Sequence, residues 1–110
     1  MFNQITLIGN LGEDAKVQAD GKLLRLRMAT SLSYKKGDEW ITDTEWHTVK
    51  QWTDQARYKA ERLPKGSKVF VQGAIYSEEY QGQKQVYIKA YFIKNLSPNP
   101  GQNQTQGTGW

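Results

Sequence analysis

Apolar and polar residues alternate through most of this chain, which is the pattern of a strand with one buried face. The alternation covers residues 2–8, 22–32, 67–76 and 84–94. Residues 44–52 are rich in β-branched and aromatic side chains and predict a further strand. Helical spacing occurs once, in residues 56–63, after a capping position at Thr53 or Asp54. The predicted order is three strands, one helix and two strands.

Glycines and apolar residues refine the limits of these strands. Gly9 and Gly12 predict a bend or a bulge inside an extended region, and residues 80–83 predict a turn before the last strand. The side chains predicted to share a buried face are Leu24, Leu26, Met28 and Leu32 in the second strand, and Val86, Ile88, Ala90 and Phe92 in the last strand.

The stretch at residues 44–52 places its side chains on two faces in alternation. One face carries Trp46, Thr48, Lys50 and Trp52, and the other carries Glu45, His47, Val49 and Gln51. The first face is either a core face, because aromatic side chains supply much buried area, or an exposed platform on which flat ligands stack. Lys50 favours the platform, since lysine is rarely buried. The residues alone leave both possibilities open.

Basic residues lie on the second strand and in the connection that follows it. Arg25 and Arg27 alternate with apolar residues, so they belong either to solvated surface or to a path for an anion. The connection holds Tyr34, Lys35, Lys36 and Trp40 around a Gly-Asp turn. This connection is either a flexible loop that wraps a polyanion or an ordinary solvated hairpin.

Composition excludes several classes of site. The chain has 110 residues, which suits one domain, and its lack of cysteine excludes disulfides and thiolate metal sites. His47 is the single histidine, which argues against a histidine-rich metal site or a histidine-based triad, and we expect no cofactor. A net charge of +4 and a pI of about 9.3 favour an anionic partner. Without a leader pattern or a long apolar run, the expected location is the cytoplasm.

The last part of the chain differs in composition from the rest. From Ser97 onward Asn, Gln, Gly, Thr and Pro dominate, and no charged side chain follows. Such a segment buries too little apolar surface to become ordered. We therefore predict one domain in residues 1–96 and a disordered, uncharged tail in residues 97–110.

The order of the predicted elements indicates a specific fold. Five strands with one helix between the third and the fourth is the order of the oligonucleotide/oligosaccharide-binding (OB) barrel, an all-β Greek-key architecture. This barrel binds its ligand across the face of its second and third strands. Residues 44–52 form the third strand, so the fold favours the exposed platform over the core face.

Four motifs resemble those of bacterial single-stranded DNA-binding proteins. They are Leu-Ile-Gly-Asn-Leu-Gly at residues 7–12, Ala-Thr-Ser at 29–31, Thr-Glu-Trp-His at 44–47 and Lys-Gly-Ser at 65–67. They occur in the family's order and approximate spacing, and they cover nearly all of residues 1–94. The resemblance implies a homotetramer, or else a dimer, with single-stranded DNA wound over several barrels.

The resemblance also implies roles for particular residues. Trp46, Trp52, Tyr34 and Tyr80 match four base-stacking positions, and His47 matches a histidine at the contact between subunits. The candidates to contact phosphates are Arg25, Arg27, Lys35, Lys36, Lys50 and Lys89.

The chain departs from the family pattern in its acidic residues. Glu78 and Glu79 precede Tyr80 where the family tends to be basic, and Asp54 stands where lysine is common. These carboxylates should repel phosphate, so we expect weaker binding or a strand path that avoids this hairpin. The family's tail usually ends in an acidic tip that recruits proteins, and this sequence ends without one. That ending argues against tail-mediated partners and is expected of a phage or plasmid form or of a truncated sequence.

The function predicted from these features is non-enzymatic, sequence-independent binding of single-stranded DNA. Such a protein would protect exposed strands in replication, recombination or repair. A related barrel that acts as an adaptor, such as a primosomal replication protein, is the second hypothesis. The third and least supported hypothesis is an enzyme. The sequence pairs no carboxylate with a nucleophile and shows no cluster of metal ligands.

Overall fold

The computed structural model describes residues 1–97. Its elements are β1 (Ile5–Leu11), β2 (Lys16–Gln18), a 3₁₀ turn (Ala19–Gly21), β3 (Leu23–Lys36), β4 (Glu39–Trp52), α1 (Ala56–Ala60), β5 (Lys68–Tyr80) and β6 (Gln83–Asn95). The tail predicted in residues 97–110 lies outside the described residues from residue 98 onward, and so does Trp110.

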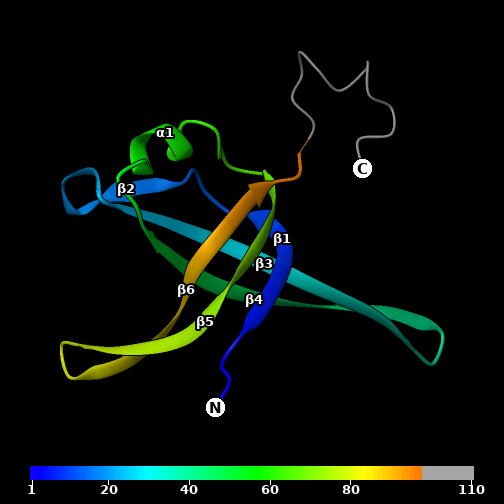
Figure 1. The fold of residues 1–110 in the computed structure, drawn as a ribbon. Helices are drawn as coiled ribbons and strands as arrows, with labels where there is room; N and C mark the ends of the chain where they lie inside the picture. Colours follow the sequence, from blue (N-terminus) through cyan, green and yellow to red (C-terminus); the bar gives the residue numbers. More distant parts are fainter. Residues whose placement is uncertain (98–110) are drawn as a thin grey trace, which may run out of the picture.

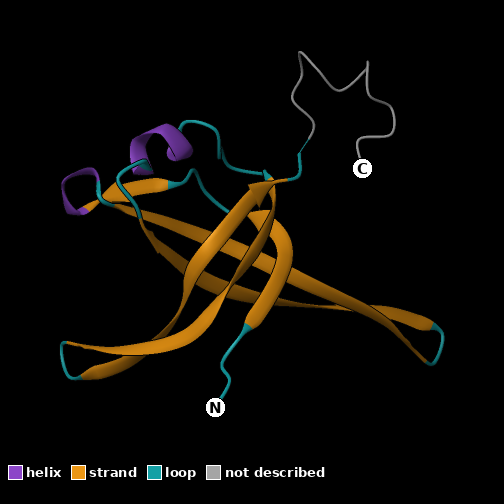
Figure 2. Ribbon diagram, viewed as in Figure 1, coloured by secondary structure: helices purple, strands orange, loops and turns teal. Residues whose placement is uncertain are grey.

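Five strands close into a barrel (Figures 1 and 2). Around the barrel the strands follow the order β1, β5, β6, β4 and β3, and pairing of β3 with β1 closes the circle. All these pairs are antiparallel except β4 with β6, which is parallel. The predicted OB architecture is therefore confirmed, with the helix between β4 and β5. The short β2, which the sequence pattern did not indicate, pairs with the start of β3.

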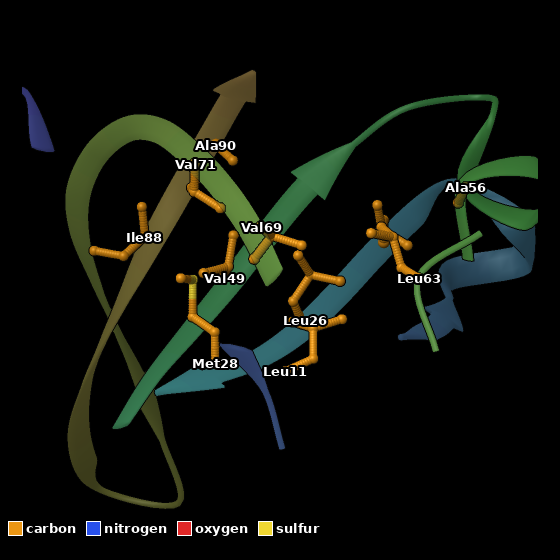
Figure 3. Packing of buried hydrophobic residues seen from close by; sticks show 11 residues of the cluster. Leu11, Leu26, Met28, Val49, Ala56, Leu63, Val69, Val71, Ile88 and Ala90 are labelled. Atoms are coloured by element: carbon orange, nitrogen blue, oxygen red, sulfur yellow. The ribbon is translucent and has the colours of Figure 1, made fainter. Parts of the chain in front are cut away.

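The core fills the inside of this barrel. Leu24, Leu26 and Met28 of β3 point inward and are fully buried, as their alternation predicts. Figure 3 shows how side chains from β1, β3, β4, β5 and β6 meet there. The remaining buried apolar residues of this cluster are Leu11, Val49, Ala56, Leu63, Val69, Val71, Ile88 and Ala90.

Gly9 lies where β1 closes the barrel against β3. A side-chain carbon at Gly9 would overlap the carbonyl oxygen of Ala29, so this close approach of two backbones requires glycine. The two glycines predicted a bend or bulge inside an extended region. β1 continues through Gly9 to Leu11, and the bend comes at Gly12. Gly9 allows β1 and β3 to approach closely, and Gly12 lies at the bend where the chain leaves β1.

A β-bulge in β6 reverses the phase of its last residues. The pairing register between β5 and β6 skips Tyr91. Ala90, before the bulge, is buried as predicted, but Phe92, after it, is exposed and Ile93 packs on the core instead. The prediction for Phe92 was wrong because it assumed an unbroken two-residue period, and one inserted residue moves every later side chain to the opposite face.

The helix is shorter than its sequence pattern indicates. It spans Ala56–Ala60, and Gln55 occupies the N-cap position without a side-chain capping bond. The predicted cap at Thr53 or Asp54 was therefore wrong, although the Thr53 hydroxyl oxygen does accept a hydrogen bond from the Gln55 backbone N–H, at 3.1 Å. Leu63 is buried although the helix has ended.

Two long hairpins extend from the barrel in different directions (Figure 1). The strand predicted over residues 44–52 begins at Glu39, and it forms with β3 a continuous ladder around the turn at Gly37 and Asp38. The connection is thus an ordered hairpin, not a flexible loop. Leu32 and Val86 were predicted to face the core but are exposed, because they lie on parts of the hairpins that have no barrel beneath them.

Candidate nucleic-acid interface

One face of β4 is exposed to solvent and the other is buried. Trp46 and Trp52 are 49% and 55% exposed, whereas Val49 is fully buried and Gln51 nearly so. The alternative in which the tryptophans form a core face is therefore wrong. Exposing the apolar surface of an indole to water is unfavourable. Two exposed tryptophans on a rigid strand therefore suggest that this face binds a ligand.

Two polar residues on the inner face of β4, His47 and Gln51, have hydrogen-bond partners. The Lys59 ammonium donates to the Gln51 side-chain oxygen at 2.9 Å, and Nε2 of His47 lies 2.9 Å from the Thr30 hydroxyl. Burial of these groups is tolerated because they have partners. Polar side chains are uncommon on a core face, and the hydrogen-bond partners of Gln51 and His47 explain why this face can lie inside.

The outward side chains of four adjacent strands form one surface, which we call the aromatic face. Residues directly opposite in antiparallel strands point to the same side, which joins Thr48 with Arg27 and Tyr76 with Tyr87. Tyr76 and Tyr87 stack with their ring centroids 6.0 Å apart. The members of the aromatic face are Arg25, Arg27, Trp46, Thr48, Lys50, Trp52, Tyr76, Glu78, Tyr80, Tyr87 and Lys89.

Trp46 is held in place by its neighbours on this face. The Arg27 guanidinium lies 5.5 Å from the Trp46 ring centroid, and Arg27 also donates a hydrogen bond to the Thr48 hydroxyl at 3.2 Å. Gly12 lies against the other end of the ring, where a side-chain carbon would overlap it. The indole is therefore fixed in orientation while about half of its surface stays open to a ligand.

The other cations of the aromatic face differ in how far they are already paired. The Lys50 ammonium lies 2.5 Å from a Glu78 carboxylate oxygen and 4.8 Å from the Tyr87 ring centroid. Lys89 lies 5.0 Å from the Tyr76 ring centroid and forms no ion pair within residues 1–97. Arg25 lies 3.8 Å from a carboxylate oxygen of Glu13, near the edge of the face.

A hollow of about 280 Å³ lies beside Trp46, with Tyr87 also lining it. It forms where β4 and β6 diverge, since these strands pair at only two positions, Val49 with Ile88 and Lys50 with Lys89. The hollow can admit a planar group next to the indole. No cluster of three or more acidic or histidine side chains that could hold a metal ion occurs in residues 1–97.

The predicted stacking residues are not all on the same face. Tyr80, 60% exposed, continues the aromatic face along the β5–β6 hairpin. Tyr34, 40% exposed, pairs with Ile41 on the opposite side of the β3–β4 hairpin. An uninterrupted register from Leu23 to Lys36 fixes this assignment. Trp46, Trp52 and Tyr80 thus share a side, and Tyr34 does not.

Trp40 is an aromatic candidate that the predicted stacking set missed. It is 71% exposed, pairs with Lys35 and shares the side of Trp46. Trp40, Trp46 and Trp52 are spaced six residues apart, an even interval that keeps them on one side of a strand. That spacing was a usable signal, but the strand was predicted to begin only at residue 44, which left Trp40 in a loop.

The acidic departures have distinct positions. Glu78 lies on the aromatic face against Lys50, whereas Glu79 points to the other side of β5, opposite Lys84 in the register. Asp54 is exposed in the turn before α1. Only Glu78 of these three therefore introduces negative charge into the middle of the aromatic face, and there it is already paired.

Comparison with known proteins identifies the family. A model described as the single-strand binding protein family matches residues 2–97. The chain belongs to this family. It is 30% identical over 112 aligned residues to a single-stranded DNA-binding protein of Neisseria meningitidis serogroup A, covering 96% of this chain and 64% of that relative. The family and this relative are both named for binding, which agrees with the expectation of a non-enzymatic protein.

Solved structures agree with the family in fold. A small single-stranded DNA-binding protein from Streptomyces coelicolor has a TM-score of 0.62 at 25% identity, with 86% of this chain and 95% of that chain covered. The single-stranded DNA-binding protein of Plasmodium falciparum, solved in complex with single-stranded DNA, has a TM-score of 0.75 at 22% identity, with 88% and 96% covered. Among residues 1–97, α1 is far too short to cross a membrane.

Proposed function

We propose that this protein binds single-stranded DNA without sequence preference and protects exposed strands during replication, recombination or repair. The observation that carries the proposal is the pair of half-exposed tryptophans on β4, fixed on a rigid barrel among cationic side chains. Every base has a flat face, so stacking on Trp46 and Trp52 accepts any sequence. Duplex DNA hides these faces inside its helix and offers only its backbone to such a platform.

The proposed path of the strand uses both the barrel and the hairpins. Bases stack on Trp46 and Trp52, and the hairpins add Trp40, Tyr80 and, from the other side of its ribbon, Tyr34. Cationic side chains then contact the phosphates between the stacked bases, and each contact releases counterions and makes affinity fall with salt. The proposed phosphate contacts are Arg25, Arg27, Lys35, Lys36, Lys50 and Lys89.

Titration with oligo-dT tests this proposal through intrinsic tryptophan fluorescence. We expect strong quenching that weakens as salt rises, and Trp46→Ala should reduce binding by about 1–3 kcal/mol, the cost of one stacked base. Tyr58→Ala is the matched control, because Tyr58 is exposed on α1 and its ring packs against Arg62 instead of joining the aromatic face. A duplex of the same length should bind much more weakly than oligo-dT.

A protein that neither binds oligo-dT at low salt nor changes its fluorescence would contradict the proposal. In that case the aromatic face would serve a protein partner, and the adaptor hypothesis would replace single-strand binding. Loss of binding in Trp46→Ala and Tyr58→Ala alike would also contradict it, because the effect would not depend on the aromatic face.

We further propose that the protein acts in the cytoplasm as a homotetramer. Ile8, Phe70 and Phe92 form an apolar patch on the wall made by β1, β5 and the end of β6, and Ile8 and Phe92 are exposed. A second copy of the chain would cover this patch, and His47 would lie at a contact between subunits. Light scattering would then give about four times the chain mass of 12.6 kDa.

A further inference from the structure

The Lys50–Glu78 pair lies in the middle of the aromatic face and connects its two halves. Lys50 belongs to β4 and Glu78 to β5, and these strands are separated by β6 in the barrel. The Lys50 side chain is 17% exposed and that of Glu78 is 43% exposed, so the pair is partly screened from water by its neighbours. Tyr87 of β6 lies beneath the ammonium and completes the contact.

The pair is poorly explained by a need for stability. Ion pairs that remain accessible to water contribute little to folding, because the gain in attraction is offset by lost side-chain freedom. Arg27 and Lys89, on the same face, are held by aromatic rings and form no ion pair within residues 1–97. A carboxylate beside Lys50 therefore removes positive charge from a surface that otherwise accumulates it.

We propose that Glu78 is an internal counterion that occupies Lys50 until a DNA phosphate displaces it. Glu78 thereby sets the affinity of the aromatic face and its dependence on salt. This inference rests on the proposed binding of single-stranded DNA and deepens it, because it names a residue of this chain that limits that binding. The strand path need not avoid the β5–β6 hairpin, because the Glu78 charge is compensated where it stands.

The proposal has a quantitative consequence for salt dependence. A free lysine that contacts a phosphate of single-stranded DNA releases counterions and steepens the plot of log affinity against log salt by about 0.7. When the phosphate must first displace Glu78, the freed carboxylate stays unpaired beside the DNA and offsets this gain. Removing the Glu78 charge should therefore recover the full contribution of Lys50.

The deciding experiment compares Glu78→Gln with Glu79→Gln in the full chain. The two substitutions change net charge equally, but Glu79 points to the opposite side of β5. We expect Glu78→Gln to bind oligo-dT up to about fivefold more tightly at low salt. Its affinity should also fall about 2.6-fold further than that of the wild type between about 50 and 200 mM salt. Glu79→Gln should stay close to the wild type in both measurements.

A Lys50→Gln substitution completes the test as a double-mutant cycle. Lys50→Gln should weaken binding in the wild-type background, because the Glu78 carboxylate is then uncompensated beside the phosphates, and it should abolish the gain in the Glu78→Gln background. Equal effects of Glu78→Gln and Glu79→Gln would overturn the proposal, because net charge alone would then explain them. Weaker binding in Glu78→Gln would overturn it as well, because the carboxylate would then be a favourable contact.

The contact itself is testable without DNA. Reductive methylation followed by mass spectrometry should modify Lys50 several-fold faster in Glu78→Gln than in the wild type or in Glu79→Gln. Equal rates in all three proteins would overturn the proposal, because no ion pair would then protect the ammonium. If no variant binds oligo-dT at low salt, the proposed function fails and this inference fails with it. If the wild type binds but Glu78→Gln behaves like Glu79→Gln, only this inference fails.

Discussion

The β3–β4 and β5–β6 hairpins have the same backbone design but different surfaces. Both extend beyond the barrel, and both turn within two residues. The turn at Gly37 and Asp38 has positive φ only at the glycine, as in a type II′ turn, whereas Gln81 and Gly82 both have positive φ, as in type I′. These two turns are the ones that match the natural twist of paired strands.

The side chains on the two hairpins lead to different expectations. On the side shared with Trp46, the β3–β4 hairpin presents Lys35 and Trp40 and no carboxylate. The β5–β6 hairpin presents Glu78 and Tyr80 on that side. We therefore expect an ordered, exposed hairpin to contact nucleic acid only where the side chains of one face favour it. The residues that alternate onto one face decide what it can bind.

The largest expected difference between the hairpins is in their aromatic residues. Trp40→Ala should weaken oligo-dT binding by about 1–3 kcal/mol, because a large, exposed indole opposite Lys35 is a strong stacking site. Tyr80→Ala should cost about 1 kcal/mol or less, because Tyr80 has a smaller ring and lies on the strand that carries Glu78. Titration of both variants with oligo-dT at one fixed salt concentration measures the difference.

Tyr34→Ala provides the control within the β3–β4 hairpin. Tyr34 lies on the opposite side of the ribbon from Trp40, so its removal should cost less than the removal of Trp40. If Tyr80→Ala or Tyr34→Ala reduces oligo-dT affinity more than Trp40→Ala does, the DNA does not follow the face that joins Trp40 to Trp46. The proposed difference between the two hairpins would then be wrong.

A smaller expected effect distinguishes the two faces of the β3–β4 hairpin by charge. Lys35→Gln should flatten the salt dependence of oligo-dT binding by about 0.7 in slope, because Lys35 lies on the side of Trp40 and Trp46. Lys36→Gln removes the same charge from the opposite side, where Lys36 faces Glu39, and should change the slope less. Affinities at several salt concentrations give the slopes. Equal slopes in the two variants would show that the DNA does not distinguish between the two sides of this hairpin.

Much of the fold could be predicted from local patterns. The alternation of Leu24, Leu26 and Met28 identified a buried strand face, and the sequence around Gly82 identified a turn. These predictions hold because strand alternation and turn conformation depend on residues adjacent in the chain. The element order then identified the barrel, and the barrel predicted that β4 faces the ligand.

The candidate site could be predicted only in part. Trp46 and Trp52 were placed correctly on an exposed face, but Trp40 was missed because the polar residues around it hid the extension of β4. Tyr34 was grouped with them by resemblance, although its register places it on the opposite side of the hairpin. Alternation within a strand can assign a face only when the limits of that strand are known.

The sequence by itself determined which side chains share a face within each regular strand and the order of the elements along the chain. The tertiary structure decided which face of β4 is inside, because Gln51 and His47 meet their hydrogen-bond partners Lys59 and Thr30 only in the folded chain. It also decided that Phe92 turns outward after the bulge and that Lys50 meets Glu78, 28 residues away. Such contacts arise between strands that come together only when the barrel closes, so no local pattern records them.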